Sequence, residues 1–195
     1  MQPLELYIHI PFCVKKCAYC DFLSGPAGEK EKEEYVKMLV DEIRNCPDTV
    51  QNYRVISIFF GGGTPSLLTG EQIGRLMDTV REIFTLDEDA EITMEMNPGT
   101  VTEEKLRKYR QAGVNRLSIG LQSVNDEELR LLGRIHTYEE FREAYHLARA
   151  NGFSNINVDL ISAIPGQTVE SWRRTLEQVM ALSPEHISAY SLIVE

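Results

Sequence analysis

Short apolar runs alternate along the chain with longer stretches in which hydrophobic residues recur at helical spacing. The runs predict six strands, at residues 4–9, 55–60, 91–96, 116–122, 155–161 and 186–194. The periodic stretches predict five helices, at residues 30–44, 70–84, 102–111, 138–150 and 169–180. Thr69 and Thr102 are expected to cap two of these helices, and Gln72 completes a capping box with Thr69. Because strands joined by crossover helices run parallel, the alternation predicts an α/β fold of six βα units.

Polar residues near the ends of three predicted strands distinguish between two architectures that share this alternation, an open doubly wound sheet and a curved partial barrel. Glu95, Gln122 and Asp159 each lie on a polar strand face near the carboxyl end, opposite an apolar face. Buried carboxylates are costly without partners, so a ligand or a cation is expected beside them. Barrels of the α/β class carry their chemistry at this end of their strands. The pattern therefore favours a partial (β/α)6 TIM-like barrel.

Length and charge narrow the classes of protein further. The 195 residues are too few for a complete eight-unit barrel, which needs roughly 250 residues. The formal net charge of −10 argues against nucleic acid as a partner, since such binding needs a basic surface. The first residues show neither the basic nor the apolar segment of a signal peptide, and no apolar run approaches the roughly 18 residues of a membrane helix. We therefore expect a cytoplasmic protein without a transmembrane segment.

Three of the four cysteines follow the first predicted strand closely: Cys13, Cys17 and Cys20, separated by three and two residues. In a reducing compartment, thiols with such spacing bind metal more often than they form disulfides. Three thiolates can hold an iron–sulfur cluster with one iron left open. A structural zinc ion needs a fourth ligand, and the nearby His9 lies within the predicted strand. Spacing alone leaves a cluster, a zinc site and an incidental grouping as alternatives.

The cysteine spacing resembles the signature of radical S-adenosylmethionine (SAM) enzymes. In that superfamily three cysteines hold a [4Fe–4S] cluster, whose open iron chelates SAM, and reduction of the cluster cleaves SAM to a 5′-deoxyadenosyl radical. The resemblance implies the six-stranded partial barrel of radical SAM domains. Six further motifs resemble the oxygen-independent coproporphyrinogen III oxidase family: YIHIPFC (7–13), AYCDF (18–22), GGGTP (61–65), EMNP (95–98), SIGLQ (118–122) and DLI (159–161).

One position departs from the true oxidases of that family, which carry a further cysteine two residues after the third. That position is Phe22 here, and the sequence CDF at 20–22 resembles instead the HemW branch, whose members bind haem and are thought to act as haem chaperones. The resemblance implies a role in haem or porphyrin metabolism, with haem as cargo and a haem-acceptor protein as a possible partner. Oxidative decarboxylation of coproporphyrinogen III to protoporphyrinogen IX is the alternative function, so enzymatic activity stays open. A zinc-stabilised domain without redox chemistry is the third.

The resemblance also implies particular site residues, none of them assigned a catalytic role. The cluster would be held by Cys13, Cys17 and Cys20, and the SAM site would be lined by Tyr7, Tyr19, Gly62, Gly63, Thr64, Glu95, Gln122, Arg134, Asp159 and Ile193. Within this set, the glycines and Thr64 would contact the SAM amino group and Arg134 its carboxylate. Tyr19 would shield the cluster, and Ile193 would pack beside the adenine.

The end of the chain bears on its domain organisation. Residues 1–195 are expected to form one radical SAM core domain, with the last residues in or just after the sixth predicted strand. Members of the resembling family continue with a C-terminal domain that helps to cover the barrel mouth. We therefore expect a truncated core from which the C-terminal domain is absent.

Overall fold

The fold is a curved, six-stranded parallel sheet, seen in a computed structural model that describes residues 1–193. The strands are β1 (Gln2–Ile10), β2 (Tyr53–Gly62), β3 (Thr85–Met96), β4 (Arg116–Gln122), β5 (Asn155–Ser162) and β6 (His186–Ser191). The helices are α1 (Glu29–Arg44), α2 (Gly70–Ile83), α3 (Glu103–Ala112), α4 (Asp126–Leu131), α5 (Tyr138–Ala150) and α6 (Val169–Ala181), with 3-10 turns η1 (Asp48–Asn52) and η2 (Pro65–Leu67).

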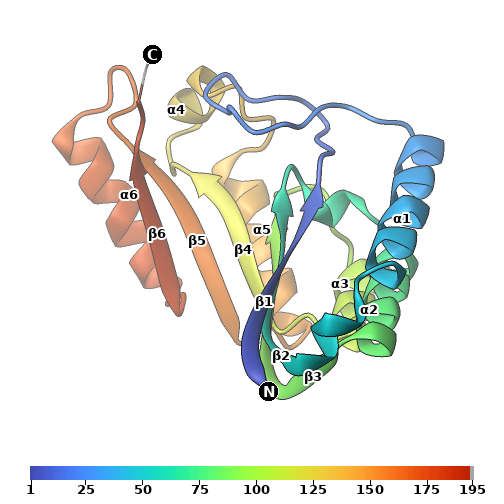
Figure 1. Cartoon of the computed structure of the whole chain (residues 1–195). Coiled ribbons are helices and arrows are strands. Elements are labelled where there is room, and N and C mark those ends of the chain that lie inside the picture. The colour runs from blue at the N-terminus through green and yellow to red at the C-terminus, as the bar shows by residue number, and fades with distance from the viewer. Residues whose placement is uncertain (194–195) are drawn as a thin grey trace.

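The strands follow one another in chain order, and every neighbouring pair is parallel. β1 and β6 are the two edges of the sheet, so the barrel is not closed. The other helices lie along the outer side of the curved sheet, whereas α4 lies beyond the carboxyl ends of the strands, where the loop after β1 passes it (Figure 1). This arrangement confirms the predicted partial (β/α)6 barrel.

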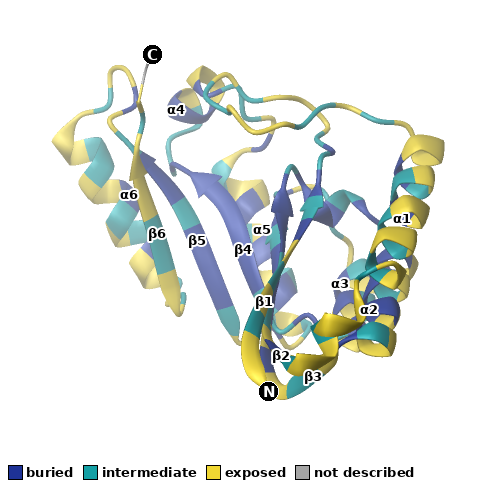
Figure 2. Cartoon of the chain, in the orientation of Figure 1, coloured by how far each residue is buried: buried dark blue, intermediate teal, exposed yellow. Residues whose placement is uncertain are grey.

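The core lies between the sheet and the covering helices. β4 and β5 are almost wholly buried, whereas β6 and the outer face of α1 are exposed (Figure 2). Fully buried side chains from the strands include Phe60, Met94, Ile119 and Val158, and they pack with helix residues in one continuous cluster. The apolar positions of β4 and β5 recur at every second residue, which is why the sequence located these strands well, whereas β3 begins at Thr85, six residues before its predicted start.

The sequence also predicted two helix caps correctly, but it missed one short helix and extended the last strand too far. Thr69 and Gln72 form the capping box of α2, and the side chain of Thr102 caps α3. Helix α4 was not predicted, because its six residues are too few to show helical periodicity. The last predicted strand was too long: β6 ends at Ser191, and Val194 lies outside the described residues. None of the helices within residues 1–193 is long and apolar enough to span a membrane.

Candidate functional site

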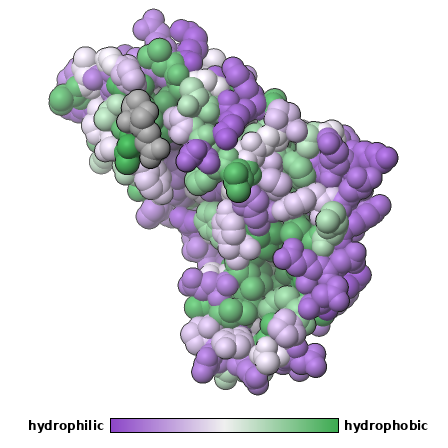
Figure 3. Space-filling model, turned by 45° about the horizontal axis from the view of Figure 1, so that its top comes forward, coloured by the Kyte–Doolittle hydropathy of each residue, from purple (hydrophilic) through white to green (hydrophobic). Residues whose placement is uncertain are grey.

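The carboxyl ends of the strands surround a cavity of about 470 Å³, a size that suits a small-molecule ligand. All the predicted site residues except Tyr7 line it: Cys13, Cys17, Tyr19, Cys20, Gly62, Gly63, Thr64, Glu95, Gln122, Arg134, Asp159 and Ile193. The face that includes this rim carries hydrophobic surface in a central hollow framed by hydrophilic groups (Figure 3). The partial barrel therefore brings residues from every part of the chain to one site.

The three cysteines lie half-buried and unpaired in the loop between β1 and α1. Backbone hydrogen bonds hold this loop at both ends: the Cys13 amide donates to Gly25 O at 2.9 Å, and the Ala18 amide donates to Leu132 O at 3.0 Å. The second bond ties the loop to the end of α4. Helix α4, which the sequence did not reveal, therefore supports the cysteine loop.

The three thiols and His9 are the candidate metal ligands that the sequence offers at this rim. Among the described residues, no group of three or more His, Cys, Asp or Glu side chains converges on one metal ion. The thiols that hold a cubane cluster do not need to converge on one metal ion, because each thiolate binds a different iron. His9, the one candidate for a fourth zinc ligand, instead lies 3.2 Å from Leu23 O and 3.4 Å from the Tyr7 hydroxyl.

The glycine loop after β2 lies directly against the chain that leads to Cys13. A Cβ on Gly63 would stand 2.7 Å from the carbonyl oxygens of Ile10 and Phe12, so only glycine allows this approach. The Gly63 amide donates to Ile10 O at 2.9 Å, and the Thr64 amide donates to Phe12 O at 2.7 Å. The glycines thus serve the packing of two loops as well as the cavity wall.

Two carboxylates face the cavity with different numbers of partners. Glu95 Oε2 accepts one hydrogen bond, from the Gly62 amide at 3.0 Å. Burial, with a smaller contribution from the nearby Asp159 charge, raises the pKa of Glu95 to about 7. Asp159 accepts from Ser118 Oγ at 2.8 Å and from Asn157 Nδ2 at 2.7 Å. Burial raises the pKa of Asp159 too, but these hydrogen bonds oppose the shift.

Two buried polar atoms at the cavity have no hydrogen-bond partner: Gln122 Oε1 and Arg134 Nε. Gln122 also has a φ of 76°, a left-handed conformation that is uncommon outside glycine. Unpaired buried polar groups are rare and call for an explanation such as a missing ligand. The chemistry of three thiols, a free guanidinium nitrogen and an under-paired carboxylate fits an iron–sulfur cluster with a zwitterionic ligand beside it.

Arg134 is the most connected cation of the site. Its Nη2 donates to Gly120 O at 2.6 Å and to Asn97 Oδ1 at 2.7 Å, and its Nη1 donates to Cys17 Sγ at 3.8 Å. Asn97, which also lines the cavity, was missed as a site residue from the sequence. The available signal was its position in the EMNP motif directly after β3.

The aromatic and aliphatic site residues differ in their exposure and in their position relative to the cavity. Tyr19 packs with Leu192 on a small apolar cluster beside the cavity, which fits a shielding role. Ile193 lines the cavity but is 81% exposed. Tyr7 is 60% exposed, stacks on Phe59 and lies outside the cavity lining. The predicted contact of Tyr7 with SAM therefore stays a prediction.

The fold and the site together define a class of protein: an open parallel α/β barrel with a three-cysteine loop at its carboxyl rim. The model of the Radical SAM superfamily matches residues 7–179, so the chain belongs to the radical SAM superfamily. Among curated relatives, it is 46% identical to the heme chaperone HemW of Escherichia coli (strain K12), over 100% of this chain and 52% of the relative. It is 42% identical to the heme chaperone HemW of Haemophilus influenzae, with the same coverage of both chains.

Solved structures agree with this assignment. Coproporphyrinogen III oxidase (HemN) from Escherichia coli, a radical SAM enzyme, superposes with a TM-score of 0.90 at 37% identity, covering 98% of this chain and 44% of that one. Native anSMEcpe with bound AdoMet shares the fold, with a TM-score of 0.67 at 14% identity, covering 97% of this chain and 52% of that one. The chain spans about half the length of the curated relatives it matches.

Proposed function

We propose that this chain is the core of a HemW-type haem chaperone that binds a [4Fe–4S] cluster and SAM. The observation that carries the proposal is the shared cavity, bordered by the three-cysteine loop, two unpartnered polar atoms and two half-buried carboxylates. A cluster bound there supplies one-electron chemistry and an open coordination position. Arg134 has a free Nε for a ligand carboxylate, and Glu95 is an acceptor for an ammonium or hydroxyl group.

Phe22 and the names of the relatives favour the chaperone over the oxidase. Phe22 is 63% exposed and lines the cavity at the position where the resembling oxidases carry a further cysteine. Its phenyl ring cannot bind metal or transfer a proton. The HemW relatives are named heme chaperones. Haem as cargo, a haem-acceptor protein as partner and a cytoplasmic location belong to the same proposal.

The alternative is oxidative decarboxylation of coproporphyrinogen III. The high TM-score with HemN at 37% identity is the observation in its favour. Phe22 counts against it, because the resembling oxidases have cysteine there.

Anaerobic reconstitution with iron and sulfide tests the first part of the proposal. We expect about four irons per chain and an EPR signal of the reduced cluster that changes when SAM is added. A chain that takes up no iron and sulfide, or that binds zinc alone, would contradict the proposal.

The reconstituted chain is then offered haem and coproporphyrinogen III in separate experiments. We expect haem to give a saturable shift of its Soret band. Formation of protoporphyrinogen IX from coproporphyrinogen III, with SAM and a reductant present, would instead select the oxidase.

A further inference from the structure

Asn97 was not among the predicted site residues, but it occupies a central position at the rim. It follows β3 directly, and both ends of its side-chain amide are engaged. Its Nδ2 donates to Thr64 Oγ1 at 2.8 Å, and its Oδ1 accepts from Arg134 Nη2 at 2.7 Å. The amide therefore joins the loop after β2 to the loop after α4.

Each of the two partners of Asn97 reaches a different cysteine. The Thr64 hydroxyl donates to Cys13 Sγ at 3.4 Å, and Arg134 Nη1 donates to Cys17 Sγ at 3.8 Å. Because Asn97 Nδ2 occupies a lone pair of Thr64 Oγ1, the hydroxyl proton is free to point at the sulfur. Because Asn97 Oδ1 holds Nη2 on the other side, the remaining edge of the guanidinium faces Cys17 and the cavity.

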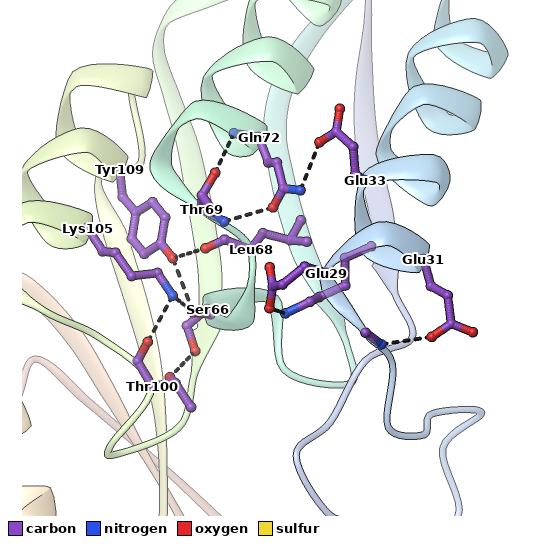
Figure 4. A network of polar contacts seen from close by, with 12 residues as sticks. Glu29, Glu31, Glu33, Ser66, Leu68, Thr69, Gln72, Thr100, Lys105 and Tyr109 are labelled. Carbon is purple, nitrogen blue, oxygen red and sulfur yellow. Dashed lines mark hydrogen bonds and ion pairs between the residues drawn. The ribbon is translucent and has the colours of Figure 1, made fainter.

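Asn97 is itself held firmly by the polar network behind the rim. Its backbone amide donates to Ser66 Oγ at 3.3 Å, and its carbonyl accepts from Thr100 Oγ1 at 2.6 Å. Lys105 of α3 donates to the carbonyl oxygens of both Ser66 and Thr100, which locks the two loops together (Figure 4). A residue anchored in this way can orient its neighbours at little entropic cost.

We infer that Asn97 is a positioning residue, which directs the Thr64 hydroxyl and the Arg134 guanidinium at two of the sulfurs that hold the cluster. The inference rests on the proposed function. Hydrogen bonds to the sulfurs of an iron–sulfur cluster stabilise its more negative, reduced state and so raise its reduction potential. Asn97 therefore tunes the potential at which the cluster accepts an electron, although it touches neither iron nor sulfur.

Asn97→Asp tests this role, because a carboxylate of the same shape can accept from Arg134 but cannot donate to Thr64. The Thr64 hydroxyl then turns to the new carboxylate and leaves Cys13. The added charge lowers the potential as well, so Asn97→Asp is measured in the wild-type chain and in a Thr64→Val background. The readout is the cluster's midpoint potential, from an EPR-monitored redox titration of the reconstituted chain.

We expect Asn97→Asp to lower the potential more in the wild-type chain than in the Thr64→Val chain. The difference between the two shifts is the part that Asn97 exerts through Thr64. We expect it to correspond to about a tenfold change in the reduction equilibrium, or about 59 mV for one electron. Asn52→Asp, which adds the same charge at an exposed position before β2 at the far end of the strands, should leave the potential unchanged.

The outcomes separate this inference from the proposed function. A wild-type chain that forms no cluster contradicts the proposed function and the inference with it. A chain that forms the cluster, yet shows equal Asn97→Asp shifts in both backgrounds, contradicts the role of Asn97 alone. If Asn97→Asp folds without taking up iron, the uncharged Asn97→Leu replaces it in the same two backgrounds: a larger drop in potential in the wild-type chain supports the inference, and equal shifts overturn it.

Discussion

Two polar networks lie next to each other in this protein, and they differ in how completely they are paired. Behind the rim, Lys105 and Tyr109 of α3 donate to the backbone carbonyls of residues 66, 68 and 100 (Figure 4). At the rim, Gln122 and Arg134 each retain a buried polar atom without a partner. Among the described residues, just one other buried side-chain atom, Ser24 Oγ, is unpaired.

The charged groups of the two networks show the same contrast. Burial lowers the pKa of Lys105 to about 8. Its ammonium group has two carbonyl partners, and the residue does not line the cavity. Burial raises the pKa of Glu95 to about 7, and the carboxylate has one amide partner and faces the cavity. A fully paired buried network stabilises one fold, whereas an incompletely paired one beside a cavity is suited to a ligand.

The largest expected effect concerns the cysteine loop at the rim. Cys17→Ser should abolish stable incorporation of the cluster, because the remaining two thiols cannot hold it. Iron and sulfide content after anaerobic reconstitution measures the loss. Cys46→Ser is the matched control: Cys46 packs against the core far from the cavity lining, so the substituted chain should load a full cluster. Equal loading of both variants would contradict the assignment of the cluster to this loop.

Removing the cation of the paired network should reduce stability more than any rim substitution. Lys105→Met leaves the Thr100 carbonyl oxygen without its lysine donor and the Ser66 carbonyl oxygen with the Tyr109 hydroxyl alone, so we expect the free energy of unfolding to fall by about 1–3 kcal/mol. Urea denaturation measures the change. Lys108→Met, one turn further along α3, removes surface ion pairs to Glu71 and Glu104 and should lower the stability much less than Lys105→Met does. A Lys105 variant as stable as the Lys108 variant would remove the contrast between the networks.

Removing the cation of the incompletely paired network should affect ligand binding more than folding. Arg134→Gln takes away the free Nε and the charge, so we expect SAM to bind the reconstituted chain roughly 10- to 100-fold more weakly. Equilibrium dialysis with labelled SAM measures the affinity. Arg142→Gln, which removes an exposed arginine paired with Glu139 on α5, should leave the affinity unchanged. Loss of stability without loss of affinity in Arg134→Gln would assign this arginine to the fold.

The smallest expected effect is a pH dependence that Glu95 imposes on the ligand-free chain. The folded-state pKa of about 7 lies above the ordinary value of 4.5, so the folded chain binds more protons than the unfolded chain between these values. Stability should therefore fall as pH rises from about 4.5 to about 7, by about 1–2 kcal/mol after allowance for solvent screening. Above about pH 7 this loss of stability is complete.

Glu95→Gln should flatten this decline, measured as the urea midpoint at several pH values. Asp159→Asn should flatten it less, because the hydrogen bonds from Ser118 and Asn157 oppose the rise in the pKa of Asp159. If the stability of Glu95→Gln falls with pH as steeply as that of the wild type, the Glu95 carboxylate is not the group whose ionisation destabilises the folded chain.

Much of the site was predictable because it depends on position along single strands. Glu95, Gln122 and Asp159 were expected near the carboxyl ends of their strands, and parallel pairing places all three at one cavity. The cysteine loop was predicted from spacing, since three thiols within eight residues can reach one centre. Tyr7 shows the limit of such reasoning: its strand was predicted, but its side chain lies beside Phe59, outside the cavity lining.

Local patterns in the sequence were enough to predict the order of the six strands and many of the residues at the rim, because hydrophobic periodicity and family motifs are local properties. The contacts that make the rim a site were decided by tertiary structure alone. Thr64 meets Cys13 across 51 positions, and Arg134 meets Cys17 across 117, with Asn97 between them. Such contacts depend on the curvature of the sheet and the packing of three loops, which no local pattern encodes.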